Sequence, residues 1–363
     1  MHIADVTMFY AARSGGIRRY LDVKHAWLRQ RAHRHTLVVP DRNGCPCDEA
    51  TLALPSVALP LSGGYRLPLG VRRATRDLVR LRPHVIEAAD PYHLAWAALR
   101  ARDKLGTRAV AFCHSDLPRL VADSYGARAE RWAARYFTRL YREFDMVLAP
   151  SAFLARKLEC WGITRVAQQP LGADTTVFHP SKRSADTRAS LGVSSGARLL
   201  VYAGRFAPEK NIPVLVDAVR ALGRPYQLLL IGSGGALPER LPSNVRVLPF
   251  IAERDQLASM LASCDAFVHA GDQETFGLAA LEAMACGLPV VGINEAGVAE
   301  IVTPDSGLLV APRDAHAFAD GVARLFAGDL FALRAEARRV AERYAWQPLL
   351  EQMLQRYRQI DGA

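Results

Sequence analysis

Residues 197–234 read ARLLVYAGRFAPEKNIPVLVDAVRALGRPYQLLLIGSG, and this stretch decides the fold class. Its first part, ARLLVYAG, is a short apolar run typical of a buried strand. The following IPVLVDAVRALG has the apolar spacing of a helix, and YQLLLIGSG is a second apolar strand. Two buried strands joined by a helix predict a unit in which the strands are parallel and lie side by side in one sheet.

The same alternation fills the rest of the chain in two series. The first series runs from HIADVTMFY at residues 2–10 to DMVLAPS at residues 145–151, and the second starts at residue 197. The segment QQPLGADTTVFHP at residues 168–180 is rich in turn formers and is the natural linker. A chain of 363 residues is too long for one ordinary core. We therefore expect an α/β fold of two doubly wound domains, residues 1–170 and 171–344, that face each other across a cleft where ligands bind.

Composition and cysteine usage narrow the class of protein. The chain has 50% hydrophobic and 23% charged residues, as soluble globular proteins do. No stretch approaches the roughly 18 consecutive apolar residues of a membrane-spanning helix, and the start of the chain has no basic region before its apolar run. We expect no signal peptide, and reduced cysteines in a cytoplasm. Cys45 and Cys47 lack a second ligand pair nearby, so a plain loop is favoured there over a metal site.

The net charge of +10 lies entirely in the first half of the chain. Residues 1–175 hold 27 Lys and Arg against 16 Asp and Glu, whereas residues 176–363 hold 19 against 20. A one-sided basic surface suits a nucleic acid, an anionic lipid or an acidic substrate, and it can also serve only solubility. No nucleic-acid motif or stacking platform accompanies the charge, so we expect no nucleic-acid partner.

The stretch ETFGLAALEAMACGLPVV at residues 274–291 puts two carboxylates, Glu274 and Glu282, into an apolar segment. The preceding DAFVHA reads as a strand and LAALEAMAC as a helix, so the FG turn lies at the ligand-binding edge of the second sheet. The free N–H groups of the helix start, with Gly277 allowing close approach, suit a phosphate. A single glutamate there would be a helix cap, but one on each side of the turn suits the hydroxyl groups of a sugar and a ribose.

Other residues at strand ends extend this site. Arg205 and Lys210 follow the strand RLLVYAG, where two cations around a turn can hold both phosphates of a diphosphate. In the first domain, Gly15 and Gly16 lie between a strand and a helix, and His114 ends a strand. A lone histidine at such a place is more often structural, but opposite a phosphosugar it favours a role in the cleft.

These motifs together resemble those of retaining glycosyltransferases of family four, which have the GT-B fold. The similar segments are RSGGIRRY, FCHSD, PLGADTTVF, YAGRFAPEKNI, ETFGLAALEAMACGLPVV and GLLVAP, in order over nearly the whole chain. The resemblance implies that the second domain binds a nucleotide-sugar donor and the first domain an acceptor. It also implies that the final helix, within residues 345–363, packs back on the first domain.

The resemblance also implies roles for individual residues. Arg205 and Lys210 would contact the diphosphate, Glu282 the ribose, and Glu274 the transferred sugar together with the amides of the FG turn, while His114 would sit beside the sugar. The implied catalytic residues are His114, Glu274, Arg205 and Lys210. The implied donor-binding residues are Gly15, Gly16, Arg205, Lys210, Phe250, Ile251, Glu274, Phe276, Gly277, Leu278 and Glu282. No metal or other cofactor is expected, because the helix end and two cations neutralise the leaving diphosphate.

The expected reaction is transfer of a hexose or uronic acid with retention of the anomeric configuration. A UDP-sugar donor, such as UDP-glucose or UDP-glucuronic acid, is the first expectation. The alternatives are a GDP-mannose-dependent mannosyltransferase acting on a lipid or polysaccharide, a phosphorylase or epimerase, and a non-catalytic sugar-nucleotide-binding protein. Turnover and the nature of the acceptor distinguish these alternatives.

The acceptor is expected to be a membrane lipid such as diacylglycerol, as in bacterial glycolipid-forming members of the family. Basic residues between residues 61 and 84 alternate with apolar ones, as at an interface with anionic lipid. We assign the membrane face to Arg66, Arg72, Arg73 and Arg76, on a protein bound peripherally to the inner face of the cell membrane. A second basic helix, residues 127–144, also carries aromatic residues, including Trp132, and its aromatic stripe is assigned to the core. The oligomeric state is not predicted.

Overall fold

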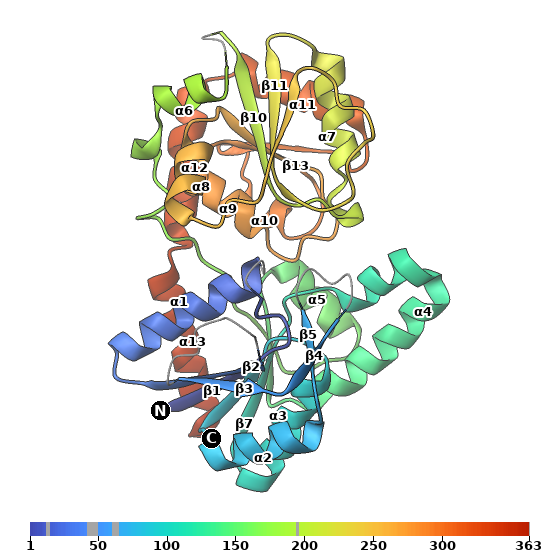
Figure 1. Cartoon of the computed structure of the whole chain (residues 1–363), viewed down its shortest axis with the longest axis vertical. Helices are drawn as coiled ribbons and strands as arrows, with labels where there is room; N and C mark the ends of the chain where they lie inside the picture. Colours follow the sequence, from blue (N-terminus) through green and yellow to red (C-terminus); the bar gives the residue numbers. More distant parts are fainter. Residues whose placement is uncertain (12–14, 42–49, 60–64, 194–195, 363) are drawn as a thin grey trace. The chain divides into compact units, whose positions relative to one another are not determined.

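The structure of the chain is a computed structural model that describes residues 1–11, 15–41, 50–59, 65–193 and 196–362. It divides into two compact units, each built on its own sheet (Figure 1). Unit 1 comprises Met1–Pro170 with Gln347–Ala363, and unit 2 comprises Leu171–Trp346. Cys45 and Cys47, considered above as metal ligands, lie outside the described residues.

Unit 1 contains a seven-stranded sheet with the order β3-β2-β1-β6-β7-β8-β9, in which every strand pair is parallel. The order reverses between β1 and β6, as in a doubly wound fold. Its central strands β1 and β6 are buried at every position, which explains why they read as continuous apolar runs. The strands are β1 (His2–Val6), β2 (Arg34–Pro40), β3 (Thr51–Leu54), β6 (Val85–Ala88), β7 (Arg108–Phe112), β8 (Met146–Ala149) and β9 (Val166–Gln168).

Helices surround this sheet, and a short antiparallel pair, β4 (Ser56–Ala58) and β5 (Arg66–Pro68), lies beside it. The helices are α1 (Gly16–Gln30), α2 (Val71–Leu81), α3 (His93–Leu105), α4 (Leu117–Arg142), α5 (Ala152–Cys160) and α13 (Trp346–Asp361). Tyr357 on α13 donates to the carboxylate of Glu87 on β6, and its hydroxyl lies 3.0 Å from the buried Lys24 Nζ. These contacts fasten the end of the chain to the first sheet.

Unit 2 contains a six-stranded parallel sheet with the order β12-β11-β10-β13-β14-β15. Its order reverses between β10 and β13, and the carboxyl ends of strands at such a switch point are where doubly wound sheets bind ligands. The strands are β10 (Arg198–Arg205), β11 (Tyr226–Ser233), β12 (Val245–Leu248), β13 (Ala266–His269), β14 (Val290–Ile293) and β15 (Gly307–Val310). The predicted α/β fold with two parallel sheets is confirmed.

Helices also cover the second sheet, and apolar residues of α7 and α11 pack against it in one core. The α-helices are α6 (Ala185–Ser190), α7 (Ile212–Leu222), α8 (Arg254–Ala262), α9 (Leu278–Ala285), α10 (Val298–Ile301), α11 (Ala315–Ala327) and α12 (Leu330–Arg343). Two short 3-10 helices, η1 (Pro180–Lys182) and η2 (Pro208–Lys210), complete the unit.

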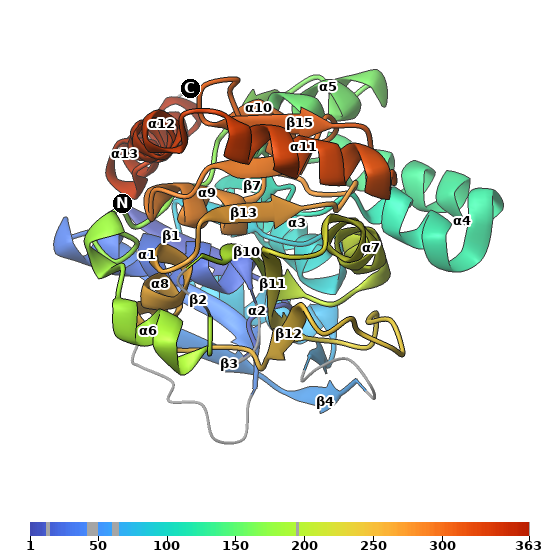
Figure 2. The same cartoon turned by 90° about the horizontal axis from the view of Figure 1, so that it is seen from above.

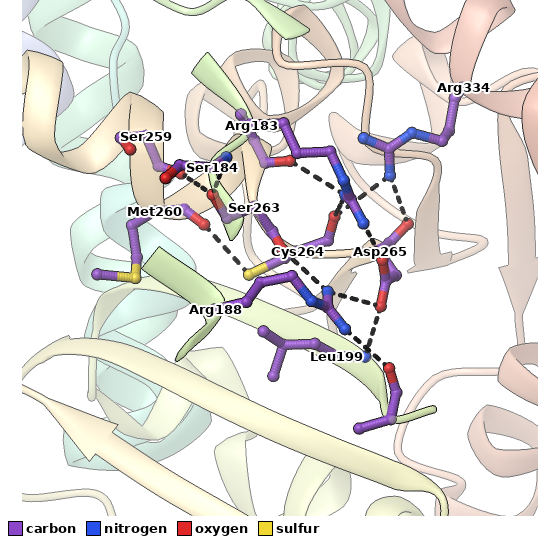
Figure 3. Close-up of polar contacts among 12 residues, drawn as sticks. Arg183, Ser184, Arg188, Leu199, Ser259, Met260, Ser263, Cys264, Asp265 and Arg334 are labelled. Carbon is purple, nitrogen blue, oxygen red and sulfur yellow. Dashed lines mark hydrogen bonds and ion pairs between the residues drawn. The ribbon is translucent and has the colours of Figure 1, made fainter. Parts of the chain in front are cut away.

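At the amino edge of the unit 2 sheet, Asp265 is the centre of a polar cluster (Figure 3). Its carboxylate accepts hydrogen bonds from Arg183 at 2.9 Å, Arg188 at 3.1 Å and the backbone N–H of Leu199 at 2.9 Å. Arg334 of α12 points into the same cluster and donates to the Asp265 carbonyl at 3.3 Å. The cluster joins the segment before β10, the start of β10 and the start of β13.

Candidate nucleotide-sugar site

The candidate site lies at the opposite, carboxyl edge of the unit 2 sheet. Arg205 is the last residue of β10, and Glu274 follows β13 by five residues, so the two residues flank the switch point. A turn with Asn211 in the left-handed region, at φ 50°, places η2 beside the end of β13, and the Asn211 side chain donates to the Ala270 carbonyl at 3.1 Å. The sheet topology therefore gathers residues that are far apart in the sequence.

Glu274 is the electrostatic centre of this edge. The ammonium of Lys210 donates to Glu274 Oε2, and Nε2 of His269 lies 3.3 Å from the same oxygen. Burial alone raises the pKa of Glu274, but the charge of Lys210 and the contact with His269 outweigh it and hold the pKa well below its usual range. The Glu274 carboxylate is therefore ionised and held in one place, as a group that accepts hydrogen bonds from sugar hydroxyls must be.

Arg205 is placed differently from Lys210. Its side chain is 67% exposed, and its Nη2 lies 3.0 Å from Glu209 Oε1 within the same turn. The structure thus brings Lys210 and Glu274 together, whereas Arg205 stands in solvent at the end of the neighbouring strand. An exposed guanidinium at this edge is available to an incoming anion.

The FG turn is packed tightly against the segment that follows β14. Gly277 has φ 98° and precedes α9, and a Cβ atom at this position would lie 2.8 Å from Val298 Cγ2. Phe276 is buried and meets the ring of Tyr344 edge to face at 5.8 Å. Leu278 is buried as the first residue of α9, so the turn presents backbone N–H groups of a helix start at the carboxyl edge.

Other predicted donor-binding residues lie along the same edge or in α9. Glu282 is 3% exposed, one turn into α9. Phe250, 44% exposed, and Ile251 follow β12, two strands away from β10. The strand β11 lies between β12 and β10. The glycine-rich segment at its end passes close to the backbone of Phe206, because a Cβ atom at Gly234 would lie 2.3 Å from the Phe206 carbonyl oxygen.

His114, Gly15 and Gly16 belong to unit 1. His114 follows β7, and its ring stacks on Phe112 with centroids 4.1 Å apart and an angle of 7° between the planes. Burial lowers the pKa of His114 to about 3, so its imidazole is neutral at physiological pH. Gly15 and Gly16 begin α1 on the surface, and among the described residues no heavy atom lies within 4 Å of a Cβ atom built on Gly15.

The residues assigned to the membrane face separate into two groups. Arg66 is tied to β4 through Ser56, with distances of 2.8 Å to its hydroxyl and 2.9 Å to its carbonyl oxygen. Arg72, Arg73 and Arg76 are exposed on α2, where Asp77 lies 3.9 Å from Arg73. Within the described ranges, no helix is long and apolar enough to cross a membrane, and no group of three His, Cys, Asp or Glu side chains is arranged to hold a metal ion.

Comparison with known proteins decides the family. Residues 14–177 match the family described as glycosyltransferase family 4, and residues 184–345 match glycosyl transferases group 1. A GDP-mannose-dependent alpha-(1-6)-phosphatidylinositol dimannoside mannosyltransferase of Mycobacterium tuberculosis is 33% identical over 98% of this chain and 95% of its own. The chain is a family 4 glycosyltransferase.

Further similarities agree with this family. A GDP-mannose-dependent alpha-mannosyltransferase of Mycobacterium tuberculosis is 34% identical to this glycosyltransferase over 82% of the chain and 79% of the relative. The solved sucrose-phosphate synthase of Thermosynechococcus elongatus superposes with a TM-score of 0.80 at 23% identity, over 99% of this chain and 98% of the other. The fold is therefore that of the GT-B glycosyltransferases.

Three features of this glycosyltransferase were missed in the sequence. His269 contacts Glu274, although its place at the end of DAFVHA was a signal like that of His114. Asp272 is paired with Arg313, whose Nη2 lies 2.6 Å away, and this pair joins the ends of β13 and β15. The assignment of the α4 aromatic stripe to the core is wrong for Trp132, which is 73% exposed on the face opposite the buried Phe137, and for Tyr136, which is 38% exposed.

Proposed function

We propose that this glycosyltransferase transfers mannose from GDP-mannose to a lipid-linked acceptor with retention of the anomeric configuration. The observation that carries the proposal is the similarity, over nearly the full length of both chains, to a relative named as a GDP-mannose-dependent mannosyltransferase. This similarity favours the GDP-mannose alternative over the UDP-sugar that the sequence analysis placed first. Arg205, Lys210 and the N–H groups at the start of α9 support a nucleotide diphosphate donor in either case.

In this proposal the donor lies along the carboxyl edge of the unit 2 sheet. Lys210 and Arg205 neutralise the diphosphate, with the N–H groups at the start of α9 as further donors. Glu282 accepts hydrogen bonds from the ribose, Glu274 accepts them from mannose, and the base lies near Phe250 and Ile251. Gly15, Gly16 and His114, which belong to unit 1, keep the roles that the family resemblance assigns to them.

The proposed step exchanges one bond on the anomeric carbon for another on the same face of the sugar. The bond from this carbon to the diphosphate oxygen breaks, and a bond to the acceptor hydroxyl oxygen forms. The hydroxyl proton passes to the leaving phosphate oxygen, so no protein nucleophile is required. Lys210 and Arg205 stabilise the negative charge that develops on the diphosphate, which is the part of the step these residues can accelerate.

A lipid acceptor is supported by the basic surface of unit 1, which includes the exposed Arg72, Arg73 and Arg76. Attraction to anionic lipid would bring the enzyme to the membrane surface where such an acceptor is found. The relative from Mycobacterium tuberculosis carries a phosphatidylinositol dimannoside in its name, so its acceptor is of the same chemical class. We therefore propose a peripheral enzyme of the inner membrane face.

Donor choice is tested first by thermal shift with GDP, UDP and ADP and then by transfer. At a GDP concentration of 100 times Kd, binding adds about 2.7 kcal/mol of stability, enough for a clear rise in Tm. Radiolabelled GDP-mannose with a membrane lipid extract should then give a labelled lipid, also in the presence of EDTA. Stabilisation by UDP alone, with transfer only from UDP-sugars, would overturn the choice of donor.

A further inference from the structure

The helix α4 is unusual because most of its residues keep exposed surface. It has 26 residues with a kink at Gly126, where φ is 79°, and its buried residues are only Pro118, Phe137, Leu140 and Tyr141. Every residue from 119 to 136 keeps exposed surface, and this part of α4 projects away from the sheet of unit 1 in both views (Figures 1 and 2). Burial in the core of unit 1 therefore does not account for the side chains along most of α4.

One face of α4 combines a large aromatic residue with arginines. Arg128, Trp132, Arg135 and Arg139 follow one another at spacings of four, three and four residues, which places them on one helix face. Phe137 and Tyr141 lie on the opposite face and are buried in the core of unit 1. Trp132 therefore points away from the core, with 73% of its surface exposed.

The positive charges of α4 outnumber its negative charges. The helix carries six arginines against Asp123 and Glu130. In the part of the chain that the structure describes, Arg128, Arg131, Arg135 and Arg139 have no ion-pair partner. A helix with this excess of positive charge favours an anionic partner.

A hollow beside this face offers a place for an anionic group. Its charged lining residues are three arginines, Arg135, Arg139 and Arg142, and one carboxylate, Glu143, and Trp161, the residue that follows α5, also lines it. Arg142 donates to the Gly162 carbonyl at 2.9 Å and to the Trp161 carbonyl at 3.2 Å, so its guanidinium is fixed. Three guanidinium groups against one carboxylate leave the hollow with an excess of positive charge, which suits a phosphate bound through paired hydrogen bonds.

We propose that the exposed face of α4 (Arg128, Trp132, Arg135 and Arg139) docks on an anionic lipid bilayer, with the Trp132 ring at the level of the headgroups. Tryptophan is favoured at this level because its ring has an apolar body and a polar N–H, while arginines beside it pair with lipid phosphates. A second copy of the chain is disfavoured as occupant, because a symmetric dimer would place these like charges against each other. The inference rests on the proposed lipid acceptor and places the membrane contact on α4, because α2 has exposed arginines but no exposed aromatic residue.

The first experiment measures sedimentation with phosphatidylcholine vesicles that contain or lack phosphatidylglycerol. Trp132→Ser should weaken binding to the anionic vesicles about tenfold, since part of the free energy of burying the ring is lost. Trp132→Phe should bind within about threefold of the wild type, because it keeps an apolar ring. The matched control is Phe331→Ser on α12 of unit 2, a residue 83% exposed, which should bind as the wild type does.

Fluorescence gives a readout specific to this side chain. The emission of the wild type minus that of Trp132→Phe isolates Trp132, and anionic vesicles should shift it to shorter wavelength as the ring leaves water. An unshifted difference spectrum together with wild-type binding of Trp132→Ser would overturn the proposal. A dimer that is lost in Trp132→Ser, or binding of duplex DNA as tight as binding of vesicles, would also overturn it.

The second experiment compares arginines on two helices of unit 1. Replacing Arg128, Arg135 and Arg139 together by Gln should lower affinity for anionic vesicles about 100-fold, since each arginine near the surface contributes about fivefold. The matched triple replacement of Arg72, Arg73 and Arg76 on α2 should lower it less than tenfold, because Asp77 lies beside these charges. Equal losses of affinity in the two triple variants would show that the vesicles are attracted by the net charge of unit 1 and would refute docking through α4.

Release of GDP from GDP-mannose, measured without vesicles, separates this inference from the proposed function. Trp132→Ser should release GDP at the wild-type rate, because Trp132 is not part of the donor site. If the wild type releases no GDP and labels no lipid, the proposed function fails, whatever the vesicles show. If the wild type releases GDP and labels lipid but does not bind anionic vesicles at low salt, only the proposed docking surface is refuted.

Discussion

Asp265 and Glu274 stand at opposite edges of the unit 2 sheet, one before β13 and one after it, and both carboxylates have cationic partners. The carboxylate of Asp265 accepts hydrogen bonds from two arginines and a backbone N–H, so its partners are groups of the fold itself. Glu274 uses one oxygen for Lys210 and His269, while Arg205 nearby is 67% exposed. Similar charges therefore stabilise the fold at the amino edge and remain available to a ligand at the carboxyl edge.

The largest effect on stability is expected from Asp265→Ala. Removal of this carboxylate leaves two guanidinium groups and the Leu199 N–H without their acceptor, which should lower the free energy of unfolding by about 3 kcal/mol. Urea unfolding followed by circular dichroism measures this loss. Below the unfolding transition the variant should bind GDP as the wild type does. A stable Asp265→Ala variant that no longer binds GDP would contradict the purely structural role of Asp265.

Lys210→Ala and Glu282→Ala should both show the opposite pattern to Asp265→Ala, a large loss of activity with a smaller loss of stability. Loss of a charged contact to the diphosphate removes about 2 to 4 kcal/mol of transition-state stabilisation, which is about 30- to 1,000-fold in kcat/KM. Stability should change much less than in Asp265→Ala. The matched control is Lys104→Ala, an exposed lysine on α3, which should keep wild-type kcat/KM and stability. Wild-type turnover of a folded Lys210→Ala variant would remove this lysine from the donor site.

The sequence was sufficient for the fold and for the edge at which the site lies. Strands such as β10 and β13 are buried on both faces, so each reads as an unbroken apolar run followed by turn residues. Once the alternation with helices is clear, Arg205, Lys210 and Glu274 must follow the carboxyl ends of parallel strands. Topology alone therefore places these residues on one edge.

Contacts between distant residues could not be predicted in the same way. The pairing of Lys210 with Glu274 spans 64 residues and depends on the left-handed conformation of Asn211, which no pattern in the sequence specifies. Trp132 and Phe137 both belong to one aromatic stretch of α4, and only packing decides that one is exposed and the other buried. Periodicity shows which residues share a face, but it does not show which face another element covers.

A smaller effect is expected from the pH dependence of stability at Glu274. Its pKa in the folded protein lies well below its unfolded value of about 4.3, so the unfolded state binds more protons between these values. The stabilisation is complete above the unfolded pKa and is lost as pH falls through the folded pKa. Between pH 6 and pH 3.5 the free energy of unfolding of Glu274→Gln should therefore fall by about 1 kcal/mol less than that of the wild type. Urea midpoints across this range test the prediction, and parallel curves would contradict it.

The smallest effect on activity is expected at His114, whose pKa is lowered by burial and, to a smaller extent, by the positive charge of Lys24. Burial lowers its pKa to about 3, against an unfolded value of about 6.5. The stability that comes from burying a neutral ring is complete above pH 6.5 and is lost progressively as pH falls toward 3. The imidazole should therefore stay neutral during turnover at pH 5 to 8. Its proton NMR signals, assigned with His114→Gln, should not move in this range, and the two proteins should have kcat/KM profiles of the same shape. An inflection near pH 6.5 that disappears in His114→Gln would show that the ring titrates in water and is not buried as the structure places it.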